Sequence, residues 1–132
     1  KMSMVVCGLT RTTDWNPFAV ALWAKAQGYY EYGVGTSWAL MTQGALLLGL
    51  NAFPVDTNET AVKDALLSGA PVVCSVSPGD FTQFGHFVIL TGIDDVGMVS
   101  LNDPNSPVNS AKKWDLQTIL YQTVSTWAFS VN

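Results

Sequence analysis

The amino-acid sequence predicts an α+β fold in which a helical first half packs on an antiparallel sheet from the second half. Helix-capping signals and apolar residues at helical spacing fill the first half, whereas short apolar runs rich in β-branched residues follow in the second. Helices that precede strands in this way are typical of α+β folds rather than of alternating α/β folds. The length of 132 residues favours a single domain over residues 1–132.

Helices in the first half are expected where a capping residue or proline precedes an apolar segment and a glycine follows it. These segments are Met2–Cys7 before Gly8, Pro17–Gln27 after the Asn16 cap, Trp38–Leu48 after Thr36 or Ser37, and Glu59–Leu67 after the capping box Asp56–Glu59. In the second of them we expect Phe18, Ala21, Leu22 and Ala26 to face the core. The aromatic and glycine-rich segment Tyr29–Gly35 is predicted to be a loop.

Strands are expected where short β-branched or aromatic runs are bounded by turn residues. The predicted strands are Leu50–Val55, Pro71–Val76, Phe87–Thr91, Met98–Leu101 and Trp127–Val131. Asp94, Asp95 and Gly97 predict a hairpin turn, and Asp115 is expected to cap one more helix, Leu116–Thr123.

Composition excludes several classes of protein. Hydrophobic residues make up 48% of the chain and charged residues 12%, which is unlike a disordered acidic segment, and no run of about 20 apolar residues is present. A net charge of −4 without a basic stripe argues against nucleic-acid binding. Two cysteines and one histidine cannot supply a four-ligand zinc site without carboxylates, so no metal is expected. The segment Gly33–Thr36 lacks the lysine of a phosphate-binding loop and follows no predicted strand.

His86 and Asp103 are the first candidates for chemistry. His86 is the one side chain that titrates near neutral pH when unperturbed, and it opens a buried strand. Asp103, or Asn102 beside it, ends the strand expected next to that one, where a carboxylate on imidazole Nδ1 would fix the tautomer. The structural alternatives stay open: a histidine hydrogen-bonded at a sheet edge, and a turn over Asn102–Ser106.

Three segments together resemble a known family. Gly85–Gly92 (GHFVILTG), Asn102–Ser106 (NDPNS) and Gly35–Trp38 (GTSW) are similar to the papain-like cysteine peptidases of the bacteriocin-processing, double-glycine-leader type, and more narrowly to their stand-alone bacterial branch. The resemblance covers nearly the whole chain and implies the papain-like fold.

The resemblance also implies roles for individual residues. His86 would be the general base and Asp103 its orienting carboxylate, with Asn102 as the alternative orienter. Trp38, Gly79 and Asp80 would line the substrate groove between the helical half and the sheet. It implies no cofactor, a peptide or protein substrate, and a bacterial protein that acts outside the cell or at its surface; the oligomeric state stays open.

The nucleophile is expected outside the chain. The family's cysteine lies in a Gly-Cys-Gly-Pro-Thr-Ser stretch, and Met4–Thr10 matches the continuation of that stretch, with Cys7 in the place of a non-catalytic serine. The nucleophile should then lie four residues upstream of Lys1, and the glutamine of the oxyanion hole further upstream. Cys7 falls at the end of its predicted helix rather than at the activating N-terminus, and Cys74 falls in mid-strand, so both are expected to be core residues.

Two alternatives to peptide hydrolysis remain. The chain could be a catalytically inactive peptide-binding module of the same fold, or it could belong to an acyl transferase or isopeptidase that uses the same three groups.

Overall fold

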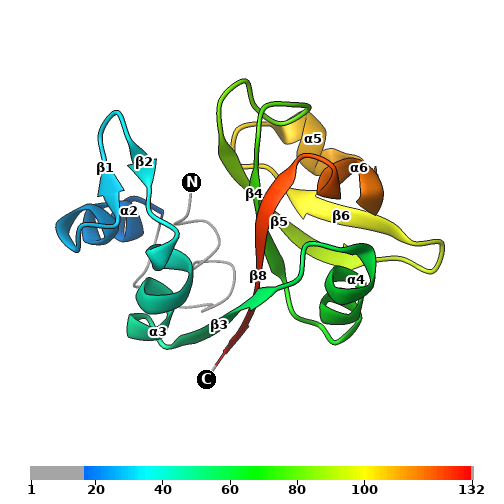
Figure 1. Ribbon diagram of the computed structural model, residues 1–132, viewed down its shortest axis with the longest axis horizontal. Coiled ribbons are helices and arrows are strands. Elements are labelled where there is room, and N and C mark those ends of the chain that lie inside the picture. Colours follow the sequence, from blue (N-terminus) through cyan, green and yellow to red (C-terminus); the bar gives the residue numbers. More distant parts are fainter. Residues whose placement is uncertain (1–16, 132) are drawn as a thin grey trace. The chain divides into compact units, whose positions relative to one another are not determined.

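The computed structural model describes residues 17–131, and their contacts divide into two compact units (Figure 1). Unit 1 comprises Lys1–Phe53 and Phe129–Asn132, and unit 2 comprises Pro54–Ala128. The predicted helix Met2–Cys7 lies outside the described residues, and a single domain over residues 1–132 stays a prediction. None of the helices within residues 17–131 is long and apolar enough to cross a bilayer.

Unit 1 begins with helix α2 (Pro17–Ala26), which confirms the predicted helix to within one residue. Its buried face is different from the expected one. Val20 and Ala24 are buried, whereas Phe18 is 73% exposed and Leu22 is 54% exposed; Ala21 and Ala26 are exposed as well. Since nearly every residue of this helix is apolar, the hydrophobic pattern does not select one face.

The predicted loop after α2 contains a small hairpin, in which β1 (Tyr30–Glu31) pairs with β2 (Gly35–Thr36). Gly33 and Gly35, with φ of 82° and 111°, adopt the left-handed conformations that close it.

The next predicted helix begins with a π-helical turn, η1 (Leu40–Gly44), and continues as α3 (Ala45–Leu47). The N-cap of η1 is Ala39, without a side-chain capping bond, and not Thr36 or Ser37 as predicted; Ser37 Oγ accepts the Ala39 N–H at 3.2 Å just before the helix.

A six-stranded sheet has the order β3-β8-β4-β5-β6-β7. Its strands are β3 (Leu50–Val55), β4 (Val72–Val76), β5 (His86–Ile93), β6 (Met98–Asn102), β7 (Trp114–Asp115) and β8 (Thr123–Val131). The pairs β4–β5, β4–β8, β5–β6 and β6–β7 are antiparallel, so the predicted α+β class is confirmed.

Two helices cover one face of this sheet within unit 2. They are α4 (Glu59–Leu67) and α6 (Leu116–Leu120), and their apolar residues pack on alternate positions of the central strands, as the two-residue repeat of a strand requires. The core includes Val62, Leu66, Val72, Cys74, Val88, Leu90, Leu101, Leu116 and Ile119.

Two predictions near the C-terminus need correction. The helix ends at Leu120 rather than Thr123, and β8 begins at Thr123 rather than Trp127. Thr126 Oγ1 donates a hydrogen bond of 2.7 Å to the Val55 carbonyl, which joins the early part of β8 to β3. Asp115 occupies the N-cap of α6, but its side chain makes no capping hydrogen bond.

The hairpin turn between β5 and β6 is confirmed. Asp94 Oδ1 accepts hydrogen bonds from the N–H groups of Val96 and Met98, at 3.0 and 2.9 Å, and Gly97 has a φ of 84°. This turn places the end of β6 beside the start of β5.

Asn58 provides a test of the local determinants of the fold. Its side-chain oxygen accepts the Ala61 N–H at 2.8 Å at the N-cap of α4, so the cap is Asn58 and not Asp56, the first residue of the predicted capping box. Asn58→Ala should lower the free energy of unfolding by about 1 kcal/mol, measured by urea denaturation, whereas Asn58→Asp should retain it. Equal stability of Asn58→Ala and the parent would contradict this role.

Candidate functional site

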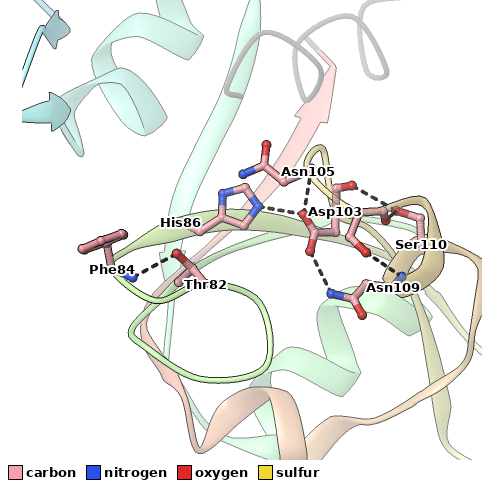
Figure 2. A network of polar contacts seen from close by, with 8 residues as sticks. Thr82, Phe84, His86, Asp103, Asn105, Asn109 and Ser110 are labelled. Carbon is pink, nitrogen blue, oxygen red and sulfur yellow. Dashed lines mark hydrogen bonds and ion pairs between the residues drawn. The ribbon is translucent and has the colours of Figure 1, made fainter.

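His86 and Asp103 meet where β5 begins and β6 ends. The Nε2 atom of His86 lies 2.7 Å from Asp103 Oδ1, and both side chains are fully excluded from solvent (Figure 2). The β5–β6 register pairs Ile89 with Asn102, so its continuation would place Asp103 diagonally opposite His86 on the same face of the sheet. The antiparallel register therefore brings together two residues that are 17 positions apart.

The contact fixes the tautomer of His86. An ionised carboxylate can only accept hydrogen bonds, so the proton in this bond lies on Nε2. The sequence led us to expect the carboxylate at Nδ1, and the structure corrects this: the orienting bond is made to the other nitrogen. In the neutral ring Nδ1 then carries the free lone pair, and it is the nitrogen able to accept a proton.

Nδ1 of His86 is also buried, and it finds no hydrogen-bond partner among the described residues. Leaving a buried polar atom unsatisfied costs about 1–3 kcal/mol, so such atoms are rare and often belong to functional sites. Among residues 17–131, His86 thus presents an unpaired proton acceptor on one side of the ring while Asp103 holds the other side.

Asp103 is stabilised as a carboxylate by three donors. Burial by itself would raise the pKa of Asp103, but hydrogen bonds from the Asn105 N–H, the His86 ring and the Asn109 amide lower it below the ordinary value of 3.8. The Asn105 N–H donates to Oδ1 at 2.9 Å, and Asn109 Nδ2 donates to Oδ2 at 3.1 Å. At neutral pH the pair therefore contains a charged acceptor for His86.

A short helix after Asp103 supplies one of these donors. Helix α5 (Pro107–Ala111) begins with Ser106 at its N-cap, where Ser106 Oγ accepts the Asn109 N–H at 3.0 Å. Ser110 Oγ accepts the Asp103 N–H at 2.8 Å, so the helix also holds the backbone of the carboxylate. Sequence reasoning missed α5, although a capping residue followed by proline, here Ser106 and Pro107, is the same kind of start signal as the Asn16 and Pro17 that predicted α2.

A comparison with protein families identifies the chain. The model of the Peptidase_C39 like family matches residues 2–129. The chain belongs to the Peptidase_C39 like family. No curated protein and no solved structure is similar enough to count as a match. Membership indicates a function of the cysteine-peptidase type and peptide substrates, and the sheet and helices of the structure are compatible with the papain-like fold.

The other residues predicted for the site of this Peptidase_C39 like protein lie in different surroundings. Asn102 is exposed on β6, and the ring of His86 is held by Asp103 instead. Gly79 and Asp80 lie against Gln122: Gln122 Oε1 accepts the Asp80 N–H at 2.8 Å, and Gln122 Nε2 donates to Asp80 Oδ2 at 3.0 Å. Trp38 belongs to unit 1 and is 46% exposed. The groove roles of Trp38, Gly79 and Asp80 stay predictions.

Cys74 cannot supply the thiolate that this family's chemistry requires. It is a free cysteine on β4 with no exposed surface, and burial raises the pKa of its thiol to about 12 despite a hydrogen bond with Thr123. A thiol with that pKa stays protonated at neutral pH, in agreement with the core role predicted for it. Cys7 lies outside the described residues.

The hydrogen bonds of Asp103 predict an acid-dependent contribution to stability. In the folded protein the pKa of Asp103 is lowered, so its carboxylate stabilises the fold at pH values above its ordinary pKa of 3.8. This stabilisation is lost as the pH falls through the pKa of the folded state. Asp103→Asn should lower the free energy of unfolding at pH 7 by about 1–3 kcal/mol, and the difference from the parent should shrink below pH of about 4. Urea denaturation of the parent and of Asp103→Asn at pH 7 and below about pH 4 measures this difference. A difference in the free energy of unfolding that does not depend on pH would contradict the ionised, hydrogen-bonded state assigned to Asp103.

Proposed function

We propose that the protein is a cysteine peptidase in which His86 is the general base and Asp103 is its orienting carboxylate. The observation that carries the proposal is the asymmetry of the His86 ring: Nε2 is held by a carboxylate at 2.7 Å, and Nδ1 has no partner within the described residues. A base that must take a proton from a thiol needs this arrangement of one donor nitrogen and one free acceptor.

The proposed reaction uses both nitrogens of His86. Nδ1 accepts the proton of the nucleophilic thiol, and the resulting thiolate attacks the carbonyl carbon of a peptide bond. The imidazolium, stabilised by the ionised Asp103 at Nε2, then returns the Nδ1 proton to the leaving amine. Water hydrolyses the thioester, with Nδ1 as the base, and the free thiol is restored. Backbone N–H groups near the nucleophile would stabilise the oxyanion.

The nucleophile is proposed to be a cysteine four residues upstream of Lys1 in the full-length protein. Support comes from the similarity of Met4–Thr10 to the segment that follows the family's nucleophile. The buried thiol of Cys74 also supports this proposal, because it stays protonated at neutral pH and so cannot act as the nucleophile.

Mutation of His86 tests the role of the base. In the full-length protein, His86→Gln should lower kcat for peptide hydrolysis by about 10²–10⁴-fold, because glutamine can still donate to Asp103 but cannot accept a thiol proton. Circular dichroism should show that this variant stays folded. Turnover within a few-fold of the parent in a folded His86→Gln would contradict the assignment.

Selective alkylation tests the proposed ion pair. At about pH 5.5 a cysteine paired with an imidazolium should react with iodoacetamide far faster than an ordinary thiol, and His86→Gln should abolish this difference. Peptide mapping should place the label upstream of Lys1. Uniformly slow labelling would favour the inactive binding module, and labelling of Cys7 would overturn the proposed nucleophile.

A separate assay distinguishes hydrolysis from acyl transfer. An added amine that captures the acyl group in preference to water would favour the acyl transferase.

A further inference from the structure

We infer that Asn109 is a positioning residue that keeps the Asp103 carboxylate aligned with His86; this inference rests on the proposed function. Asp103 Oδ1 accepts from both the His86 ring and the Asn105 N–H. Within residues 17–131, Oδ2 accepts only from Asn109 Nδ2, at 3.1 Å (Figure 2). Asn109 thus supplies the hydrogen bond that holds the second oxygen of the carboxylate.

A carboxylate that is held at only one oxygen can still rotate about the Cβ–Cγ bond of the aspartate. A donor on each oxygen restricts this rotation and keeps Oδ1 in line with His86 Nε2. Hydrogen bonds to the charged form also lower the pKa of Asp103, and the one from Asn109 is among those that outweigh the effect of burial. Removing Asn109 should therefore change both the direction and the pKa of the carboxylate that orients His86.

The backbone of Asn109 is itself fixed on both sides. Its N–H donates to Ser106 Oγ at 3.0 Å, and its carbonyl accepts the Trp114 Nε1–H at 2.9 Å. Trp114 is buried on β7, and its ring centroid lies 4.7 Å from that of Phe81. The hydrophobic core therefore fixes the position of α5, and α5 presents the Asn109 amide to Asp103.

Two substitutions separate positioning from simple packing. Asn109→Ala removes the donor, whereas Asn109→Asp has nearly the same shape but places a second carboxylate beside Asp103. Both should raise the pKa of Asp103, and Asn109→Asp should raise it more, because two like charges cannot both ionise freely at this separation. Val108→Ala is the matched control, since Val108 lies on the same helix and is 74% exposed.

Two properties of the full-length protein are measured in each variant: the titration of the Asp103 carboxyl and the pH profile of peptide hydrolysis. Carbon-13 NMR titration of the Asp103 carboxyl gives its pKa directly and without turnover. The pH profile of peptide hydrolysis should narrow from its alkaline side in Asn109→Ala, because a less well aligned Asp103 stabilises the imidazolium less. We expect kcat to fall about tenfold, with KM within about twofold of the parent. Val108→Ala should match the parent in every readout.

The outcomes separate this inference from the proposed function. Asn109 variants that leave the Asp103 titration and the pH profile unchanged would overturn the inference, even if their thermal stability fell. Full turnover in a folded His86→Gln variant would overturn the proposed function instead. The Asp103 titration would still report on Asn109 in that case, since it does not depend on catalysis.

Discussion

The hydrogen bond between His86 Nε2 and Asp103 Oδ1 is the interaction on which the candidate site depends. At 2.7 Å, and closed to solvent, it joins a ring that can carry either of two tautomers to a group that can only accept. The carboxylate thereby selects the tautomer and leaves Nδ1 as the proton acceptor. The same bond makes a buried imidazolium tolerable, because a buried charge needs an opposite charge beside it.

This bond follows from how unit 2 is built. The antiparallel pairing of β5 with β6 places the end of one strand beside the start of the next, which puts Asp103 within reach of His86. Helix α5 then closes over the carboxylate, and the indole of Trp114 holds that helix through the Asn109 carbonyl. The core thus positions two polar side chains whose removal from water is unfavourable, and each hydrogen bond donated to Asp103 offsets part of that desolvation cost.

From the sequence, the neighbouring strand ends and the turn rich in Asn, Asp and Pro predicted that Asp103 or Asn102 could approach His86, and the resemblance to the family favoured Asp103. Which ring nitrogen faces the carboxylate could not be predicted, since that depends on the orientation of the ring and not on sequence spacing. Asn109 was missed because a five-residue helix has no periodic pattern to detect. The prediction of which face of α2 is buried was wrong because apolar residues lie on all sides of this helix, so the hydrophobic pattern does not favour one face.

The most direct test of this account is the tautomer of His86. The chain contains a single histidine, so two-dimensional ¹H–¹⁵N NMR of the imidazole ring is unambiguous. We predict that in the neutral ring Nε2 carries the proton, with a downfield signal typical of a hydrogen bond to a carboxylate, and that Nδ1 is unprotonated. A proton on Nδ1 in the neutral ring would contradict the central claim, because His86 would then have no acceptor left on the side that is proposed to take the thiol proton.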